Sequence, residues 1–186
     1  MNFKYLMFAL LLTGVLFTSC DDDDPQPENE EEVITTLTMT FAPDGGGTPV
    51  TFQFKDVDGD GGNAPTITNG TLAANTTYNV SLELLNESET PVEDITEEIK
   101  DEDDEHQFFF QVSGDLNLSF AYADADGNGN PVGLETVMLT SGPSSGTLRV
   151  TLRHEPDKSA SGVNTGDITN AGGETDIEVD FDVTIQ

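Results

Sequence analysis

Apolar and polar residues alternate with a period of two along most of the chain after Val33. Alternation of this kind is typical of strands with one buried face, and Gly, Asn, Asp and Pro cluster between the alternating segments. The pattern predicts a mainly β fold, an antiparallel β-sandwich that is either immunoglobulin-like or built from two related halves. In the last segment we expect the odd-numbered residues from Ile177 to Ile185 to face the core. The predicted strands are 34–41, 50–55, 78–84, 108–112, 116–122, 134–139, 148–152 and 177–185.

One segment departs from this pattern and predicts an inserted α-helix. Thr90-Pro-Val-Glu93 is a capping box with proline at the first helical position. Val92, Ile95 and Ile99 then recur at helical spacing. We expect a helix over residues 91–105, packed by this apolar stripe.

Two parts of the chain resemble each other. Residues 52–61 align without gaps with residues 120–129, and Val80–Leu82 align with Val150–Leu152 at nearly the same offset. A duplication of half-units of about 70 residues would explain the match. Chance alternation in a β-rich chain is the alternative.

The second of the aligned loops has the spacing of a calcium site. Asp124, Asp126, Asn128 and Glu135 fit the pattern D-x-[DN]-x-[DN]-G-x5-E, in which alternate oxygens point inward and a late Glu closes the shell. The flanking segments are predicted strands, so the loop is not an EF-hand. Asp-Gly and Asn-Gly pairs are also favoured in hairpin turns that hold no metal.

The first of the aligned loops carries Asp56, Asp58 and Asp60 but Ile67 at the closing position. It therefore predicts at most a partial calcium shell. The same alternative of a plain turn applies to it.

A third candidate metal site involves both histidines of the chain. Acids crowd the expected helix end, where the helix dipole is also negative, and Glu102 stands one helical turn before His106. His154 ends a predicted strand. If folding brings Glu102, His106 and His154 together, they suit zinc or copper. A solvated acidic face and a surface histidine are the alternative.

The N-terminus predicts export and lipidation. Residues 1–19 contain one Lys and an apolar run, and Phe17-Thr18-Ser19-Cys20 resembles a lipobox. We expect a signal peptide over 1–19, an acylated Cys20, an acidic solvated tether over 20–32 and a β-sandwich domain over 33–186. A single transmembrane anchor is the alternative, but the unbroken apolar run is short for one.

Composition excludes several classes of function. The formal net charge of −30 repels nucleic acid and makes divalent cations the natural partners. Cys20 is the only cysteine, so the domain has no internal disulfide. G-x-S-x-G, H-E-x-x-H and a free nucleophilic cysteine are all missing from the sequence, and we expect no enzymatic activity.

The chain resembles a family of short acidic lipoproteins from the Bacteroidota through PVEDITEEI, DEHQFFFQ, GNPVGLET, LRHEPDK and GDITNAGGETDIEV. Members often carry the label type 1 periplasmic binding fold, which describes a two-lobed α/β protein, whereas the pattern here predicts β. The resemblance implies an outer-membrane lipoprotein on the cell surface or the periplasmic face. We expect a lipoprotein that binds a cation or small ligand, as an accessory to an outer-membrane receptor. A structural or adhesive module with calcium-stiffened loops is the alternative.

Overall fold

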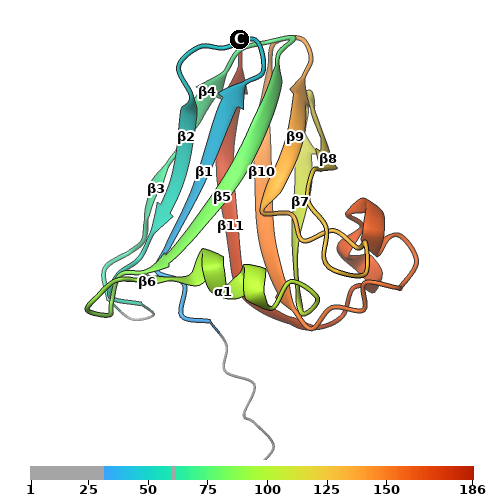
Figure 1. The fold of residues 1–186 in the computed structure, drawn as a ribbon. Helices are drawn as coiled ribbons and strands as arrows, with labels where there is room; N and C mark the ends of the chain where they lie inside the picture. Colours follow the sequence, from blue (N-terminus) through green and yellow to red (C-terminus); the bar gives the residue numbers. More distant parts are fainter. Residues whose placement is uncertain (1–31, 60–61) are drawn as a thin grey trace, which may run out of the picture. The chain divides into compact units, whose positions relative to one another are not determined.

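The computed structural model describes residues 32–59 and 62–186. This part of the chain contains two sheets with a short helix at one end (Figure 1). The expectation of a mainly β sandwich with one α-helix is confirmed. The strands are β1 (Thr36–Pro43), β2 (Val50–Lys55), β3 (Thr66–Thr68), β4 (Gly70–Leu72), β5 (Thr77–Asn86), β6 (Glu93–Asp94), β7 (His106–Gly114), β8 (Leu118–Tyr122), β9 (Glu135–Thr140), β10 (Ser144–His154) and β11 (Glu174–Ile185).

The larger sheet has seven strands in the order β3-β2-β1-β5-β9-β8, with β6 paired to β5. The smaller sheet has the order β4-β11-β10-β7. Every pairing is antiparallel except that of β11 with β4, which is parallel. All eight predicted strands are present, and β3, β4 and β6 are short strands that the alternation did not predict.

The core lies between the two sheets and is filled from the inward face of each. In β11 the odd-numbered residues from Ile177 to Ile185 are buried and Glu178, Asp180 and Asp182 are exposed, as the period of two predicts. Rings from both sheets meet in the core, since the ring centroids of Phe52 on β2 and Phe181 on β11 are 5.7 Å apart. Burial of these faces is the main force that holds the sheets together.

The helix is shorter than predicted and begins later. Helix α1 spans Ile95–Asp101, and its N-cap is Asp94, whose side chain accepts a hydrogen bond from the Thr96 backbone. The predicted capping box at Thr90 is therefore wrong. Ile95 and Ile99 are buried as expected, but Val92 is 53% exposed. The Thr96 hydroxyl bonds the backbone of Leu84 on β5, which fixes the start of the helix.

The helix ends four residues before the predicted Glu105. Glu102 is the C-cap, and β7 begins at His106. The acids after Asp101 would place negative charge against the negative end of the helix dipole, which disfavours further helical turns. Consequently His106 begins a strand and does not follow directly on a helix.

The two aligned parts of the sequence do not form equivalent halves. Val80–Leu82 belong to β5 of the larger sheet, whereas Val150–Leu152 belong to β10 of the smaller one. β2 is flanked by β1 and β3, whereas β8 ends the order of its sheet. The match therefore reflects shared alternation and shared turn residues, not two similarly folded units.

The long polar segment between β10 and β11 is ordered. It contains two short 3-10 helices, η1 (Val163–Thr165) and η2 (Ile168–Asn170). Val163 and Ala171 pack on Phe109 in a small second core, and the Gln107 side chain donates to the Val163 carbonyl. The segment therefore covers the outer face of β7 at Gln107 and Phe109.

None of the helices in the described ranges is long and apolar enough to cross a membrane. The predicted signal peptide of residues 1–19, the predicted acylation site Cys20 and the predicted tether up to residue 31 lie outside those ranges.

Candidate metal centre

The two histidines face each other at one end of the smaller sheet. His106 begins β7, His154 ends β10, and the antiparallel register pairs them directly. Their ring centroids are 4.6 Å apart. Alternate residues of a strand point to the same face. His106 precedes the core residue Phe108 by two positions and His154 follows the core residue Leu152 by two, so both side chains point toward the core. The imidazoles are therefore buried, with His106 0% and His154 4% exposed.

A β-bulge adds a carboxylate to this pair. Leu152 faces Ile177 across β10 and β11, whereas Arg153 faces Thr175, so Asp176 is one additional residue on β11. A bulge re-aims the side chain of the extra residue. The Asp176 side chain is 0% exposed, and its Oδ1 lies 4.0 Å from His154 Nδ1.

A second carboxylate comes from the segment before β1. Glu32 has a side chain that is only 4% exposed, and its Oε1 lies 2.6 Å from His106 Nε2. Its Oε2 lies 3.8 Å from His154 Nδ1. The expectation of a solvated tether up to residue 32 is therefore wrong at its last position, because Glu32 folds into the domain.

The four side chains form one group. Glu32, His106, His154 and Asp176 each offer a ligand atom, and these atoms lie within 4.8 Å of one another. The group joins the segment leading into the larger sheet to three positions of the smaller sheet. Two imidazole nitrogens and two carboxylate oxygens are donors that suit borderline divalent ions.

Several buried polar atoms in this group make no hydrogen bond within the described part of the chain. They include Glu32 Oε2 and His154 Nδ1, which face each other at 3.8 Å. That distance is too long for a hydrogen bond. His106 Nε2 is close to Glu32 Oε1, but their approach does not have hydrogen-bond geometry, so the contact is an ion pair.

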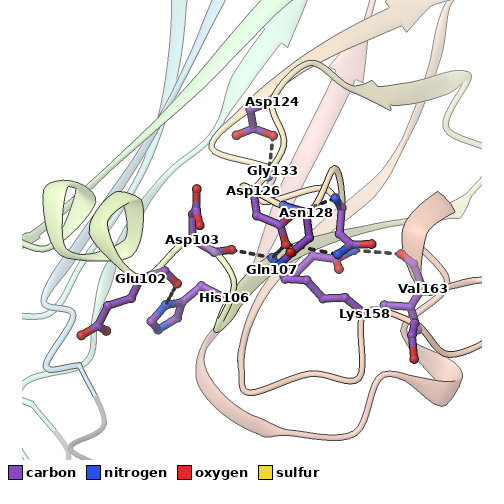
Figure 2. Close-up of polar contacts among 12 residues, drawn as sticks. Glu102, Asp103, His106, Gln107, Asp124, Asp126, Asn128, Gly133, Lys158 and Val163 are labelled. Carbon is purple, nitrogen blue, oxygen red and sulfur yellow. Dashed lines mark hydrogen bonds and ion pairs between the residues drawn. The ribbon is translucent and has the colours of Figure 1, made fainter.

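The other nitrogen of His106 has a partner. Nδ1 lies 3.2 Å from the backbone carbonyl of Glu102, the C-cap of α1 (Figure 2). When this nitrogen carries the proton and donates to the carbonyl, Nε2 is left to bind a metal ion. The end of the helix thus orients the His106 ring toward the group.

The ion pair shifts the pKa values of both partners. Burial disfavours the charged form of His106, but the Glu32 carboxylate outweighs burial and raises the pKa of His106 above its ordinary value. Burial likewise disfavours charged Glu32, but His106 outweighs it and lowers the pKa of Glu32. Each partner therefore stabilises the charged form of the other.

Glu102 belongs to this region in a way the sequence did not predict. Neither of the two candidate metal-binding groups among the described residues includes the Glu102 carboxylate. Only its backbone carbonyl contacts His106. The prediction that the Glu102 side chain is a ligand rested on the helical spacing of Glu102 and His106, and α1 ends at Asp101 before either residue.

The predicted calcium loop is organised by its own backbone and by a lysine. Asp126 is buried, and its carboxylate accepts from the backbone N–H groups of Asn128 and Asn130 and from Lys158 Nζ at 3.2 Å (Figure 2). Burial disfavours the charged carboxylate, but these donors outweigh it and lower the pKa of Asp126. The ammonium group of Lys158 thus lies where a calcium ion would need to bind.

The remaining residues of that loop are arranged in the same way. The Asp124 carboxylate accepts from the backbone N–H groups of Gly133 and Glu135. Asn128 and Glu135 are exposed. No carboxylate of this loop belongs to a candidate metal-binding group in the described ranges. In the described structure these carboxylates do not converge into the shell that the spacing predicts.

The first predicted calcium loop is described only in part, because Asp60 lies outside the described residues. Asp56 accepts from the Gly59 backbone, and Asp58 accepts from the backbone and side chain of Asn63. Both carboxylates therefore stabilise a turn, which is the alternative reading of this sequence.

In comparisons with known proteins, no family model matches the chain, and no curated protein or solved structure matches it either.

Proposed function

We propose that this protein is a non-enzymatic lipoprotein of the cell envelope whose β-sandwich binds one divalent transition metal ion through Glu32, His106, His154 and Asp176. The observation that carries the proposal is the facing pair of Glu32 Oε2 and His154 Nδ1. Both atoms are buried without a hydrogen bond among the described residues, at 3.8 Å from each other. Buried polar atoms are rarely left in this state, because each loses its hydrogen bonds to water. An ion between them would restore those lost interactions.

The formal charges of the group also suit a divalent ion. With neutral imidazoles, the Glu32 and Asp176 carboxylates carry two negative charges, which one divalent cation neutralises. Charges buried in a protein are normally paired or bound to a metal. In the metal-free protein, a proton on His106 would supply part of that compensation, and the ion would replace it.

The donor set favours zinc or copper(II) over calcium. Calcium prefers six to eight oxygen ligands, whereas imidazole suits zinc and copper. Zinc bonds of about 2.0 to 2.2 Å in a tetrahedral shell place ligand atoms about 3.3 Å apart. The contact of 2.6 Å between His106 and Glu32 would therefore lengthen, and those of 3.8 and 4.0 Å to His154 Nδ1 would shorten.

Equilibrium dialysis of the purified protein against zinc, copper(II), iron(II) and calcium tests the site. We expect one equivalent of zinc or copper with a dissociation constant below about 1 μM, or roughly 8 kcal/mol. His154→Ala and Glu32→Gln should each weaken that binding. Glu83→Gln, a matched change at an exposed position of β5, should not. Binding of calcium alone, or equal zinc binding by His154→Ala, would exclude the site.

The envelope location is supported by the sequence alone. Residues 1–19 have the form of a signal peptide, and Cys20 has the position of the acylated residue in a lipobox. Attachment of the lipid at Cys20 would place the sandwich at the outer membrane, where it could present or store metal beside a receptor. Cys20→Ala should release the protein from membranes or leave an uncleaved precursor. Unchanged mass and membrane retention of that variant would exclude lipidation.

A further inference from the structure

His154 belongs to two groups of ligand atoms at once. Its Nδ1 faces Glu32 and Asp176 in the buried group, at 3.8 and 4.0 Å. Its Nε2 lies 3.7 Å from Glu105 Oε2 on the other side of the ring. Glu105, His154 and Glu155 form a second group whose ligand atoms also lie within 4.8 Å of one another. We call it the outer group.

The two groups differ in their access to solvent. In the buried group every side chain is at most 5% exposed. In the outer group the Glu105 side chain is 52% exposed, and Glu155 is exposed as well. Only His154, the shared member, is buried, and its Nδ1 makes no hydrogen bond in the described part of the chain. The outer group therefore has an imidazole reaching into it from the buried group.

The backbone holds the two carboxylates of the outer group together. The N–H of Glu155 donates to the carbonyl of Glu105 at 2.7 Å. These two residues are the next neighbours along the chain of the paired His154 and His106. The same register that brings the histidines together thus brings these glutamates together at the end of the sheet. Their position does not depend on a flexible loop.

A hydrated ion has to exchange its water for protein ligands before it can occupy a buried group. Exposed carboxylates can replace the first waters without displacing any packed side chain. The imidazole of His154 belongs to both groups, so it offers one nitrogen to the ion in the outer group and the other nitrogen to the ion in the buried group. Of the carboxylates in the two candidate groups, only Glu105 and Glu155 are exposed.

We propose that Glu105, His154 and Glu155 form the entrance of the metal site, which captures the ion from solvent and passes it to the buried group. This inference rests on the proposed function. An entrance has a defined kinetic signature. It lowers the barrier between solvent and the buried site in both directions, so its loss slows association and dissociation by the same factor and leaves the dissociation constant unchanged. A residue that only positions His154 would change the dissociation constant instead.

The test is stopped-flow zinc binding to the purified full-length protein, with dissociation measured into excess chelator. We compare the wild type with the Glu105→Gln, Glu155→Gln double variant. The control is Asp101→Asn with Asp104→Asn, which removes the same charge from exposed positions outside both groups. We expect the double variant to associate and dissociate about tenfold more slowly, with a dissociation constant within about twofold of the wild type, and the control to change little.

Each other result overturns the entrance. Faster dissociation with unchanged association would make Glu105 and Glu155 positioning residues. If the control variant slowed as much as the double variant, the two glutamates would act only through general electrostatic attraction of the ion. If the double variant bound and released zinc at the wild-type rates, the ion would enter the buried group by another route. A wild-type protein that binds no zinc would overturn the proposed function itself, which is a different outcome from altered rates in a protein that binds.

Discussion

His106 and His154 occupy directly opposed positions on β7 and β10, with imidazole centroids 4.6 Å apart. This relationship is set by strand register and not by side-chain flexibility. A shift of one residue between the strands would turn one of the two rings to the opposite face of the sheet. The two nitrogen ligands of the proposed site are therefore preorganised before any ion binds, and the carboxylates have only to adjust around them.

The first prediction concerns the coupling of the two histidines. If both bind one ion, His106→Ala and His154→Ala should each weaken zinc binding by about 1.4 kcal/mol or more, a factor of ten. The double variant should then be little weaker than either single variant, because one missing ligand already opens the site. Isothermal titration calorimetry measures all four dissociation constants. Losses that add independently would indicate two separate weak sites.

The second prediction is a pH dependence of zinc affinity. Imidazole binds a metal only when neutral, so zinc competes with the proton that Glu32 stabilises on His106. Because the pKa of His106 is raised above its ordinary value of about 6.5, the affinity should begin to fall at a pH above that value as the pH is lowered. Competition with a chromogenic chelator across the pH range measures this. Constant affinity from pH 8 to about 6 would contradict it.

The third prediction concerns the metal-free protein. A raised pKa for His106 stabilises the fold below about pH 6.5, and this contribution is lost as the pH rises through the folded value. A lowered pKa for Glu32 stabilises the fold above about pH 4.5, and this contribution is lost as the pH falls through the folded value. The contribution of the ion pair should therefore be largest between these limits.

Glu32→Gln tests the third prediction, because it removes the carboxylate with little change of shape. Thermal melts in the presence of a chelator should show the largest loss of melting temperature for Glu32→Gln between about pH 5 and 6.5 and a smaller loss at pH 8. A loss that is the same at every pH would mean that Glu32 acts through packing alone.

The fourth prediction concerns the loop of Asp124 and Asp126. Since Lys158 Nζ contacts Asp126, calcium should not raise the melting temperature of the wild-type protein. Lys158→Met should destabilise the fold by about 1 to 3 kcal/mol, because it leaves a buried carboxylate with fewer donors. Lys55→Met, at a half-exposed ion pair with Glu87, should cost about 1 kcal/mol or less. A calcium-dependent stabilisation abolished by Asp126→Ala and Glu135→Ala would restore the calcium loop.

The strands could be predicted from the sequence because a buried face imposes a period of two, which is clearest in β5 and β11. In β7 the first five residues are all buried, because the segment between β10 and β11 also covers its outer face. Helix α1 could be predicted only in part. Ile95 and Ile99 are packed as the pattern requires, but the start of the helix depends on Asp94 and on bonds between Thr96 and Leu84 across to β5. Such tertiary bonds leave no periodic signal, and a capping-box sequence at Thr90 can occur without a helix.

The site could be predicted to a similar extent. Each histidine is in phase with the buried residues of its strand, and this was the available signal that both rings point inward. Glu32 gave no signal because it ends a run of acids, and Asp176 gave none because it reaches the group only through a bulge. The spacing of the calcium loop was misleading because a hairpin turn also places Asp side chains so that they accept from backbone N–H groups.

The most direct test of the metal centre is the zinc K-edge X-ray absorption spectrum of the protein loaded with one equivalent of zinc. Four nitrogen or oxygen ligands at about 2.0 to 2.1 Å, with the outer-shell scattering of two imidazole rings, are expected from Glu32, His106, His154 and Asp176. The imidazole contribution should fall to one ring in His154→Ala. A six-coordinate shell of oxygen atoms without imidazole scattering would contradict the account.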